Sequence, residues 1–219
     1  MLYLSIIAYI LLVIVLIITR INNKEIISLL SKTGLSIILI IFIVEISYLG
    51  NRMNMWISLS VIFSSTADIF LGIQKIEKKA KYLFYIALVL VAGSQIMLFT
   101  YSVVLTTFNI YSIPIAILIN SMLYYFFSKK CKMEKMQKYA MVYGFVFLLL
   151  IMNIIFNISI FKSNDLIYVM AIILYWISDI ILFIQKFIAE KNKNILDGMN
   201  KLISYTAQIL FVLYMIKRK

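Results

Sequence analysis

Two aspartates, Asp68 and Asp179, lie in long apolar stretches, and each is followed seven residues later by a lysine. The two eight-residue segments read DIFLGIQK and DIILFIQK and are identical at six positions. A charged residue at the centre of a membrane-spanning helix costs about 2.5–3.5 kcal/mol, so it is a functional candidate by default. Two buried carboxyl groups that share one proton form the acid and base pair that hydrolysis requires. The sequence therefore predicts acid and base chemistry at these two residues.

The lysines Lys75 and Lys186 share a helix face with the aspartates that precede them. Seven residues make nearly two helical turns, so each ammonium group is expected about 10 Å from its carboxyl group along the helix. Such a face can hold an acyl chain beside the carboxyl group and an anionic head group beside the lysine. Lysines that only extend to the lipid surface are the alternative.

Three further polar residues in the apolar stretches are candidates for the same site. Ser65 lies three residues before Asp68 and adds a polar group to its helix face, and Ser178 directly precedes Asp179. Glu45 is a third acid in apolar surroundings, with Arg52 seven residues further on as its candidate partner.

The sequence contains no histidine and a single cysteine, Cys131. Without histidine the chain cannot form a Ser-His-Asp or Cys-His nucleophile, an HExxH metalloprotease motif or a haem ligand of the histidine type. One cysteine cannot form an internal disulfide. We therefore expect neither a metal nor a cofactor, and the candidate chemistry rests on carboxyl groups.

The composition is that of a membrane protein. Of the 219 residues, 64% are hydrophobic and 14% are charged, and the mean hydropathy is +1.03. A soluble domain carries about 45–50% apolar residues, so a soluble enzyme, a disordered tail and a fibre are excluded. We predict an all-α, polytopic integral membrane protein with one membrane domain over residues 1–219.

Apolar runs recur eight times along the chain, and a spanning helix needs about 20 mostly apolar residues. Seven spans is the alternative, because the last run has 15 residues and only four residues, Thr106–Asn109, separate the fourth run from the fifth. The first run lacks the basic region and cleavage site of a signal peptide, so we expect a retained helix. The expected spans are Met1–Thr19, Thr33–Tyr48, Met55–Gln74, Tyr82–Leu105, Ile110–Phe127, Tyr139–Phe161, Leu166–Ile184 and Leu202–Ile216.

Lysine and arginine outnumber aspartate and glutamate by 21 to 9, a net charge of +12. The first, third, fifth and seventh connections between the apolar runs hold sixteen basic residues, whereas the other connections and the C-terminus hold five. The positive-inside rule places the basic connections in the cytoplasm and both termini outside a cell membrane. The basic C-terminus argues the other way and would agree with seven spans. Because this rule explains the charge, nucleic-acid binding is not expected.

The two aspartate segments are 111 residues apart, about half of the chain. This offset predicts half-repeats 1–105 and 106–219, two four-helix units of the same orientation related by a pseudo-two-fold axis along the membrane normal. The third and seventh helices would then be equivalent, with both aspartates at one depth. The alternative is that Gln-Lys only marks the end of a helix at the interface.

Several short segments resemble one family of membrane proteins. Residues 65–72 read STADIFLG, residues 175–187 read YWISDIILFIQKF, and residues 205–208 read YTAQ. Together with Lys32 at the start of the second span, these segments resemble the signature stretches of the YhhN family, which includes the animal lysoplasmalogenases. The resemblance rests on their order and spacing over most of the chain.

The resemblance implies an activity. It is hydrolysis of the vinyl ether bond of a lysoplasmalogen, a lysophospholipid of the bilayer, to a fatty aldehyde and a glycerophospho-base. Asp68 and Asp179 would be the acid and the base, in an order that the sequence leaves open. The resemblance further implies positioning residues and residues that meet the phosphate group. The positioning residues are Gln95, Gln185, Tyr205 and Gln208. The residues that meet the phosphate group are Lys32, Lys75 and Lys186.

Three positions depart from the family pattern. Gln95 stands where the family often has a histidine, Gln185 where it has an asparagine, and Thr33 where it has a proline. A glutamine side chain donates and accepts hydrogen bonds but carries no proton at neutral pH. If the histidine is essential in the family, this member is altered or inactive.

Two other functions fit the same residues. A proton-coupled transporter would also place paired carboxyl groups inside a pseudo-symmetric helix bundle. A non-catalytic lipid-binding protein could use the aspartates only to hydrogen-bond its helices together, and asparagine would then replace them without loss of function. The oligomeric state and the preferred head group are not evident from the sequence.

Overall fold

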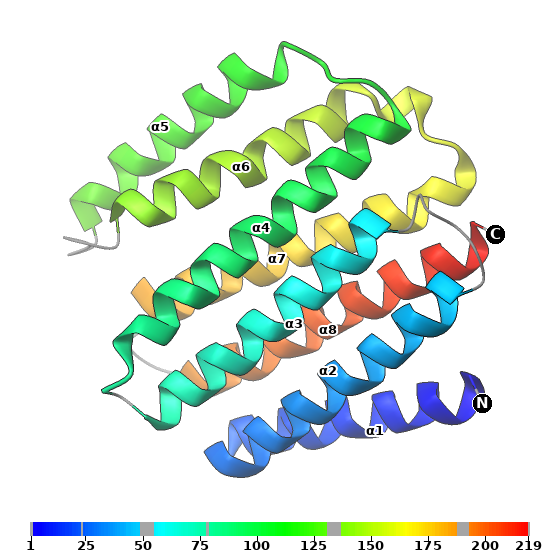
Figure 1. The fold of residues 1–219 in the computed structure, drawn as a ribbon. Helices are drawn as coiled ribbons and strands as arrows, with labels where there is room; N and C mark the ends of the chain where they lie inside the picture. The colour runs from blue at the N-terminus through cyan, green and yellow to red at the C-terminus, as the bar shows by residue number, and fades with distance from the viewer. Residues whose placement is uncertain are drawn as a thin grey trace.

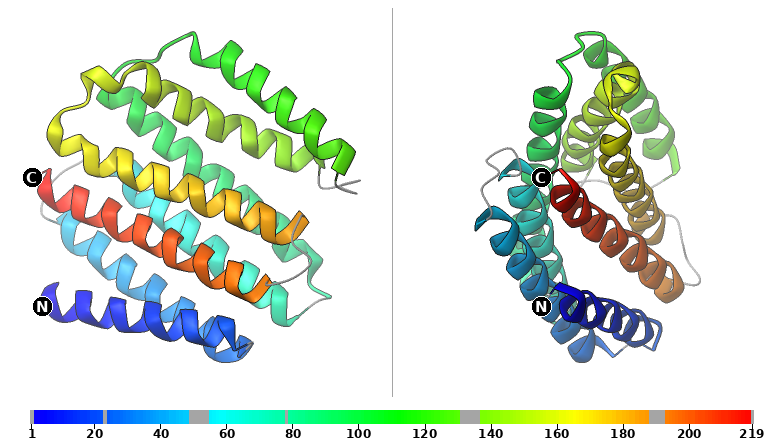
Figure 2. Two further views of the ribbon diagram at one scale, coloured as in Figure 1. Left: turned by 180° about the vertical axis from the view of Figure 1, so that it is seen from behind. Right: turned by 90° about the vertical axis from the view of Figure 1, so that its right-hand side faces the viewer.

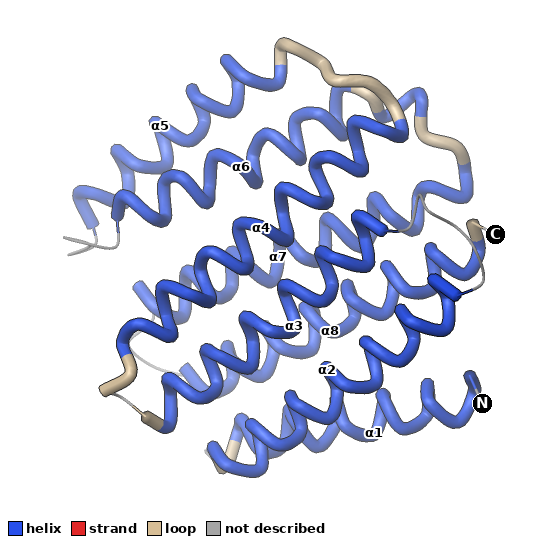
Figure 3. The backbone as a smooth tube through the Cα atoms, viewed as in Figure 1, coloured by secondary structure: helices blue, strands red, loops and turns tan. Residues whose placement is uncertain are grey.

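The described part of the chain is all-helical, as predicted. The computed structural model of the protein describes residues 2–22, 24–48, 55–77, 79–130, 137–187 and 193–218. Helices make up most of these residues, and no strand occurs among them (Figures 1 and 3). The elements are α1 (Leu2–Ile21), α2 (Glu25–Tyr48), α3 (Met55–Ile76), α4 (Lys81–Leu105), α5 (Ser112–Lys130), α6 (Gln137–Phe156), the 3-10 helices η2 (Ile158–Ile160) and η3 (Ser163–Asp165), α7 (Leu166–Phe187) and α8 (Lys193–Lys217).

Several of these helices have the length and composition of membrane spans. Among the described residues, five segments are long and apolar enough to cross a bilayer, and three shorter apolar helices accompany them. Each of the eight α-helices in the described ranges overlaps one of the eight predicted apolar runs, and the membrane character of the chain is confirmed. Eight complete crossings, and the orientation of the termini, stay predictions. The five long segments are Glu25–Ile46, Met55–Ile76, Tyr82–Leu105, Ser163–Leu182 and Lys193–Lys217.

Two helices begin eight or nine residues before the predicted span. Helix α2 begins at Glu25, and α8 begins at Lys193. The hydropathy pattern sets both boundaries directly after a lysine, at Lys32 and Lys201, yet these lysines are helical and buried. A charged side chain does not end a spanning helix when neighbouring helices supply its partners. The charge count therefore assigns these two lysines, and the buried Arg20, wrongly to the connecting loops.

The helices form a bundle in which α3 and α8 hold central places. Helix α3 packs between α2 and α4, α8 packs between α1 and α7, and α3 contacts α8. Helix α6 packs against α4 and α5. The view along the bundle in Figure 2 shows α2, α3 and α4 on one side and α1, α8 and α7 on the other. Both ends of the chain lie at the same end of the bundle (Figure 1).

Polar groups are concentrated inside the bundle, and many large apolar side chains are exposed. Buried residues include Lys32, Asp68, Gln95 and Lys201, whereas exposed ones include Val89. A water-soluble protein shows the opposite arrangement for charged residues. A surface of Ile, Leu and Val around a polar interior is the arrangement expected in lipid.

The two aspartates lie on the third and the seventh α-helix, as the sequence predicts. Helix α3 packs closely against α4, and α7 packs closely against α8. Such pairs are what a 4+4 repeat would contain, and the symmetry itself stays a prediction. The partners of Asp68 and Asp179 differ, as described below, so any symmetry does not extend to their side chains.

Candidate functional site

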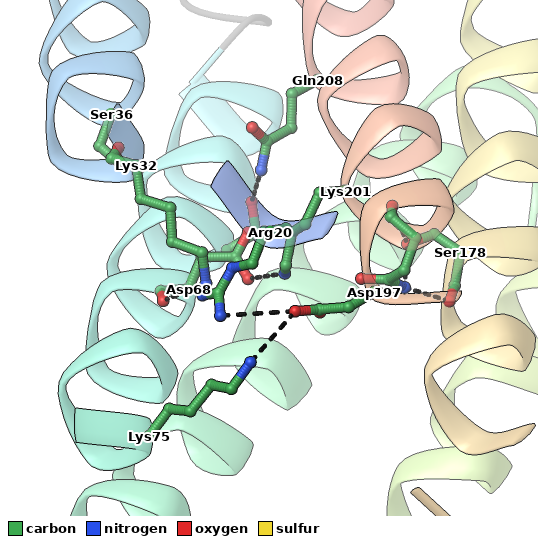
Figure 4. Close-up of polar contacts among 11 residues, drawn as sticks. Arg20, Lys32, Ser36, Asp68, Lys75, Ser178, Asp197, Lys201 and Gln208 are labelled. Atoms are coloured by element: carbon green, nitrogen blue, oxygen red, sulfur yellow. Dashed lines mark hydrogen bonds and ion pairs between the residues drawn. The ribbon is translucent and has the colours of Figure 1, made fainter. Parts of the chain in front are cut away.

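Asp68 is held in an ion pair inside the bundle. The residue lies on α3 and is 8% exposed. The Oδ1 atom accepts a hydrogen bond from Nζ of Lys201 on α8 at 2.6 Å (Figure 4). Nζ of Lys32, on α2, donates to the backbone carbonyl oxygen of Asp68 at 3.3 Å. Ammonium groups from two other helices therefore surround this residue.

Gly72 makes room for this arrangement. A Cβ atom at this position would lie 2.8 Å from Cδ1 of Leu29 and 3.6 Å from Cδ of Lys32. Contacts shorter than 3.0 Å do not occur for real Cβ atoms, so a side chain here would push against α2. The missing side chain lets α2 approach α3 closely, as small residues do at membrane helix interfaces. Lys32 thereby reaches the turn of α3 that carries Asp68.

A second carboxylate extends the charges toward the surface. Oδ2 of Asp197, on α8, lies 3.4 Å from Nη1 of Arg20 on α1 and 3.5 Å from Nζ of Lys75 on α3 (Figure 4). Nζ of Lys75 also lies 3.9 Å from Oε1 of Glu25. We name the group formed by Arg20, Lys32, Lys75, Lys201, Asp68 and Asp197 the charge cluster. Its polar groups come from α1, α2, α3 and α8.

Three members of the charge cluster are missing from the sequence-based set of candidates: Arg20, Asp197 and Lys201. Hydropathy assigns them to loops, because each lies outside the predicted apolar runs. One signal was present in the sequence. Asp197 and Lys201 are four residues apart, which is the spacing of neighbours on one helix face.

Asp179 has different partners. It lies on α7 and is partly buried. Its Oδ2 atom accepts hydrogen bonds from the hydroxyl group of Tyr143 on α6 and, at 3.2 Å, from Nε2 of Gln95 on α4. Nε2 of Gln95 also donates to the hydroxyl oxygen of Tyr143 at 2.7 Å. None of the ion pairs found among the described residues involves Asp179. Uncharged donors thus surround this carboxyl group.

Tyr175 lies between the surroundings of the two aspartates. It precedes Asp179 by about one turn of α7, and its hydroxyl group lies close to Ser64 of α3 and Ser94 of α4. Its hydroxyl group is close enough to interact electrostatically with both aspartates. The carboxyl groups of Asp68 and Asp179 also interact with one another. One polar site therefore contains both acids.

Four buried polar atoms near the aspartates have no hydrogen-bond partner within the described ranges. They belong to Ser65, Gln95, Tyr205 and Gln208. Gln95 also contacts Asp179, and Nε2 of Gln208 donates to Ser64 at 3.2 Å. Buried polar groups are nearly always hydrogen-bonded, so unpaired ones beside two acids are suited to bind a ligand.

The structure brings most of the predicted site residues together. Lys32, Ser65, Gln95, Tyr205 and Gln208 lie in the site around the aspartates, and Lys75 lies at the exposed edge of the charge cluster.

Other candidates lie apart from the site. Ser178 and Asn200 hydrogen-bond one another and join α7 to α8. Gln185 donates to the carbonyl oxygen of Lys193 at 3.1 Å. Glu45 is exposed and thirteen residues, about 20 Å, from Lys32 along α2. The side chain of Lys186, and the residues Arg52 and Cys131, lie outside the described part of the chain.

The two carboxyl groups differ in what they can do chemically. A carboxylate paired with an ammonium group is stabilised in its charged form, whereas burying a carboxylate without a cation is costly. The site therefore offers one ionised acid and one acid suited to carry a proton. Within the described residues, no group of three or more Asp, Glu or Cys side chains could hold a metal ion.

Comparisons with known proteins give one result. The model of the YhhN family matches residues 27–215, which include both aspartates and most of the charge cluster. No curated protein and no solved structure matches the chain significantly.

Proposed function

Because the chain belongs to the YhhN family, we propose that it is a membrane-embedded hydrolase. Its substrate is a lysoplasmalogen, and cleavage of the vinyl ether bond gives a fatty aldehyde and a glycerophospho-base. The proposal is carried by the unequal pairing of the two aspartates. Asp68 has an ammonium partner, and Asp179 has neutral donors. Such a difference suits a reaction that needs one acid and one base.

In the proposed reaction, protonated Asp179 transfers its proton to the β-carbon of the vinyl ether. This step forms a C–H bond and an oxocarbenium ion. Asp68 accepts a proton from water while the water oxygen bonds to the cationic carbon, which gives a hemiacetal. The Asp68 carboxylate also stabilises the positive charge of the intermediate.

The hemiacetal then breaks down. The C–O bond to glycerol breaks, and the leaving oxygen takes the proton from Asp68. The hemiacetal hydroxyl group loses its proton to Asp179 as the aldehyde C=O bond forms. Both carboxyl groups return to their first states, and the sum of the steps is the addition of one water molecule.

Tyr143 and Gln95 are proposed as positioning residues for Asp179. Both donate to Oδ2, and so they fix the direction in which the carboxyl group faces. A glutamine at position 95 carries no proton at neutral pH, so the proposed proton transfers run only through the aspartates. This member therefore does not need the histidine that the family often has.

The experiment is to incubate the purified protein in detergent with a lysoplasmalogen and, separately, with the matching ester lysophospholipid. We expect aldehyde only from the vinyl ether lipid. In D2O the aldehyde should carry one deuterium on the carbon next to the carbonyl group, because that carbon receives the proton from the acid. No aldehyde from a folded protein would overturn the proposal. Accumulation of a solute in proteoliposomes under a pH gradient would then favour the transporter.

A further inference from the structure

Lys32 is a buried lysine that has no acidic partner in contact within the described residues. The residue is 2% exposed, and within the described ranges the one hydrogen bond of Nζ goes to a backbone carbonyl group at 3.3 Å. No carboxylate oxygen of the described residues lies within ion-pair distance of it. An ammonium group has three protons to donate, so most of its hydrogen-bonding capacity is unused. An unpaired buried charge is strongly unfavourable unless a ligand completes its surroundings.

Arg20 is also only partly satisfied. It is 5% exposed, and Nη1 contacts Asp197 at 3.4 Å, which is a long ion pair. Its Nε atom is buried and has no hydrogen-bond partner in the described part of the chain. The guanidinium group lies close enough to Lys32 for a positive charge on the lysine to be repelled. Two cations with unused donors thus lie together inside the bundle.

The charge cluster as a whole has more positive than negative charge. Four basic side chains, those of Arg20, Lys32, Lys75 and Lys201, face two buried carboxylates, Asp68 and Asp197. Among the described residues, the one ion pair of Glu25 is with Lys75, at 3.9 Å, and the side chain of Glu25 is 40% exposed. An excess of positive charge in surroundings of low polarity attracts an anion. The exposed edge at Lys75, 39% exposed, offers a side from which an anion can approach.

We propose that Arg20 and Lys32 bind the phosphodiester group of a lysophospholipid, with Lys75 at the outer edge of the site. Arginine matches two phosphate oxygens with its planar fork, and lysine adds a point charge. The choice of a phosphate lipid rests on the proposed function, since Lys32 contacts the residue that acts there as the base. In a lysoplasmalogen six covalent bonds separate phosphorus from the vinyl ether carbon that water attacks, a span of at most roughly 9 Å. A head group at Lys32 would therefore leave the vinyl ether beside Asp68.

The test measures binding and needs no hydrolysis. The ligand is a 1-alkyl lysophosphatidylcholine, whose saturated ether has no double bond to protonate. Its reference is the matching 1-alkylglycerol, which lacks the phosphate group. The wild-type protein in detergent should bind the phosphate lipid at least about tenfold more tightly than the alkylglycerol. Equal affinities would overturn the proposal, whatever the outcome of the aldehyde experiment.

The variants Arg20→Gln and Lys32→Gln should each reduce this preference about tenfold while the affinity for the alkylglycerol is unchanged. The control variant Lys24→Gln removes an exposed lysine from the same end of the bundle and should leave the preference intact. If the glutamine variants do not fold, Arg20→Lys keeps the charge beside Asp197 but loses the fork, and we expect a smaller loss. An undiminished preference in folded Arg20 and Lys32 variants would contradict the site.

Competition separates a lipid head group from a free phosphate ion. Glycerophosphocholine and inorganic phosphate are each added to the complex of the protein with the alkyl lipid. We expect glycerophosphocholine to compete weakly and inorganic phosphate not to compete at millimolar concentration. Displacement of the lipid by inorganic phosphate at the same concentration as the lipid would assign the site to the free ion and overturn its assignment to the head group.

Discussion

Asp68 and Asp179 have similar sequence contexts and different chemical surroundings. Each aspartate begins a segment that ends in Gln-Lys. From this similarity the sequence predicts that the two aspartates occupy equivalent positions. The difference comes from other helices: Lys201 of α8 meets Asp68, whereas Tyr143 of α6 and Gln95 of α4 meet Asp179. The sequence could identify the two acids, because a charge in an apolar stretch is conspicuous. It could not assign their roles, because the partners lie far away in the chain.

The hydrogen bond of Tyr143 to Asp179 gives a prediction on kinetics. Tyr143→Phe removes one of two donors to Oδ2 and should lower kcat for aldehyde release by about ten- to a hundredfold. KM should change little, because the ring is retained and the lost contact is to the acid. The exposed Tyr111→Phe is the control. An unchanged kcat would show that Tyr143 does not position the acid.

The ion pair between Lys201 and Asp68 gives a prediction on stability. Lys201→Met leaves a buried carboxylate without its cation and should lower the free energy of unfolding by about 3–5 kcal/mol. The double variant with Asp68→Asn should lose less than the sum of the two single losses, because the single variants remove the same interaction. Unfolding in mixed detergent measures all three variants. Additive losses would argue against a pair that stabilises the bundle.

At the scale of helices, the sequence predicts which segments are helical better than where they begin. The starts of α2 and α8 lie before the predicted spans, since hydropathy treats Lys32 and Lys201 as loop residues. These lysines are buried through partners on α3. For the same reason Asp197 is absent from the predicted site. The missing information concerns packing between helices, and no run of apolar residues encodes it.

Substitutions at two glycines, Gly72 and Gly198, test the close packing of α2 on α3. Gly72→Ala would place a methyl group against Leu29 and Lys32, and should lower the free energy of unfolding by about 1–3 kcal/mol. Gly198 on α8 is the matched control, since a Cβ atom there would meet nothing closer than 3.4 Å. Gly198→Ala should leave stability unchanged or raise it by up to about 1 kcal/mol. Equal effects in the two variants would contradict the role given to Gly72.

At the scale of the whole molecule, the bundle has a second polar cluster, far from the two aspartates. Nη1 of Arg218 donates to the hydroxyl oxygens of Tyr101 and, at 2.8 Å, Tyr214. The hydroxyl group of Tyr214 donates to Oδ1 of Asp165 at 2.6 Å. Tyr214 lies thirteen residues, about 20 Å, from Lys201 along α8. This cluster joins the C-terminal end of α8 to α4 and η3.

A substitution in this second cluster should therefore lower the stability of the protein without changing its activity. Tyr214→Phe leaves Asp165 with one hydrogen bond fewer and should lower the free energy of unfolding by about 1–3 kcal/mol. We expect kcat and KM for aldehyde release to stay at their wild-type values below the melting temperature. Thermal unfolding and the aldehyde assay on the same preparation test both statements. A change in KM without a loss of stability would place Tyr214 in contact with the substrate.

In the proposed reaction both intramembrane aspartates carry the hydrolysis, and replacing each of them by asparagine tests this. Aldehyde release from a lysoplasmalogen is measured for the purified wild-type protein, Asp68→Asn, Asp179→Asn and the exposed control Glu77→Gln. Each asparagine keeps the shape of the side chain but neither carries nor accepts the proton, so we expect a loss of about a hundredfold or more in both. The control should retain wild-type activity. Wild-type rates in either folded asparagine variant would contradict the account.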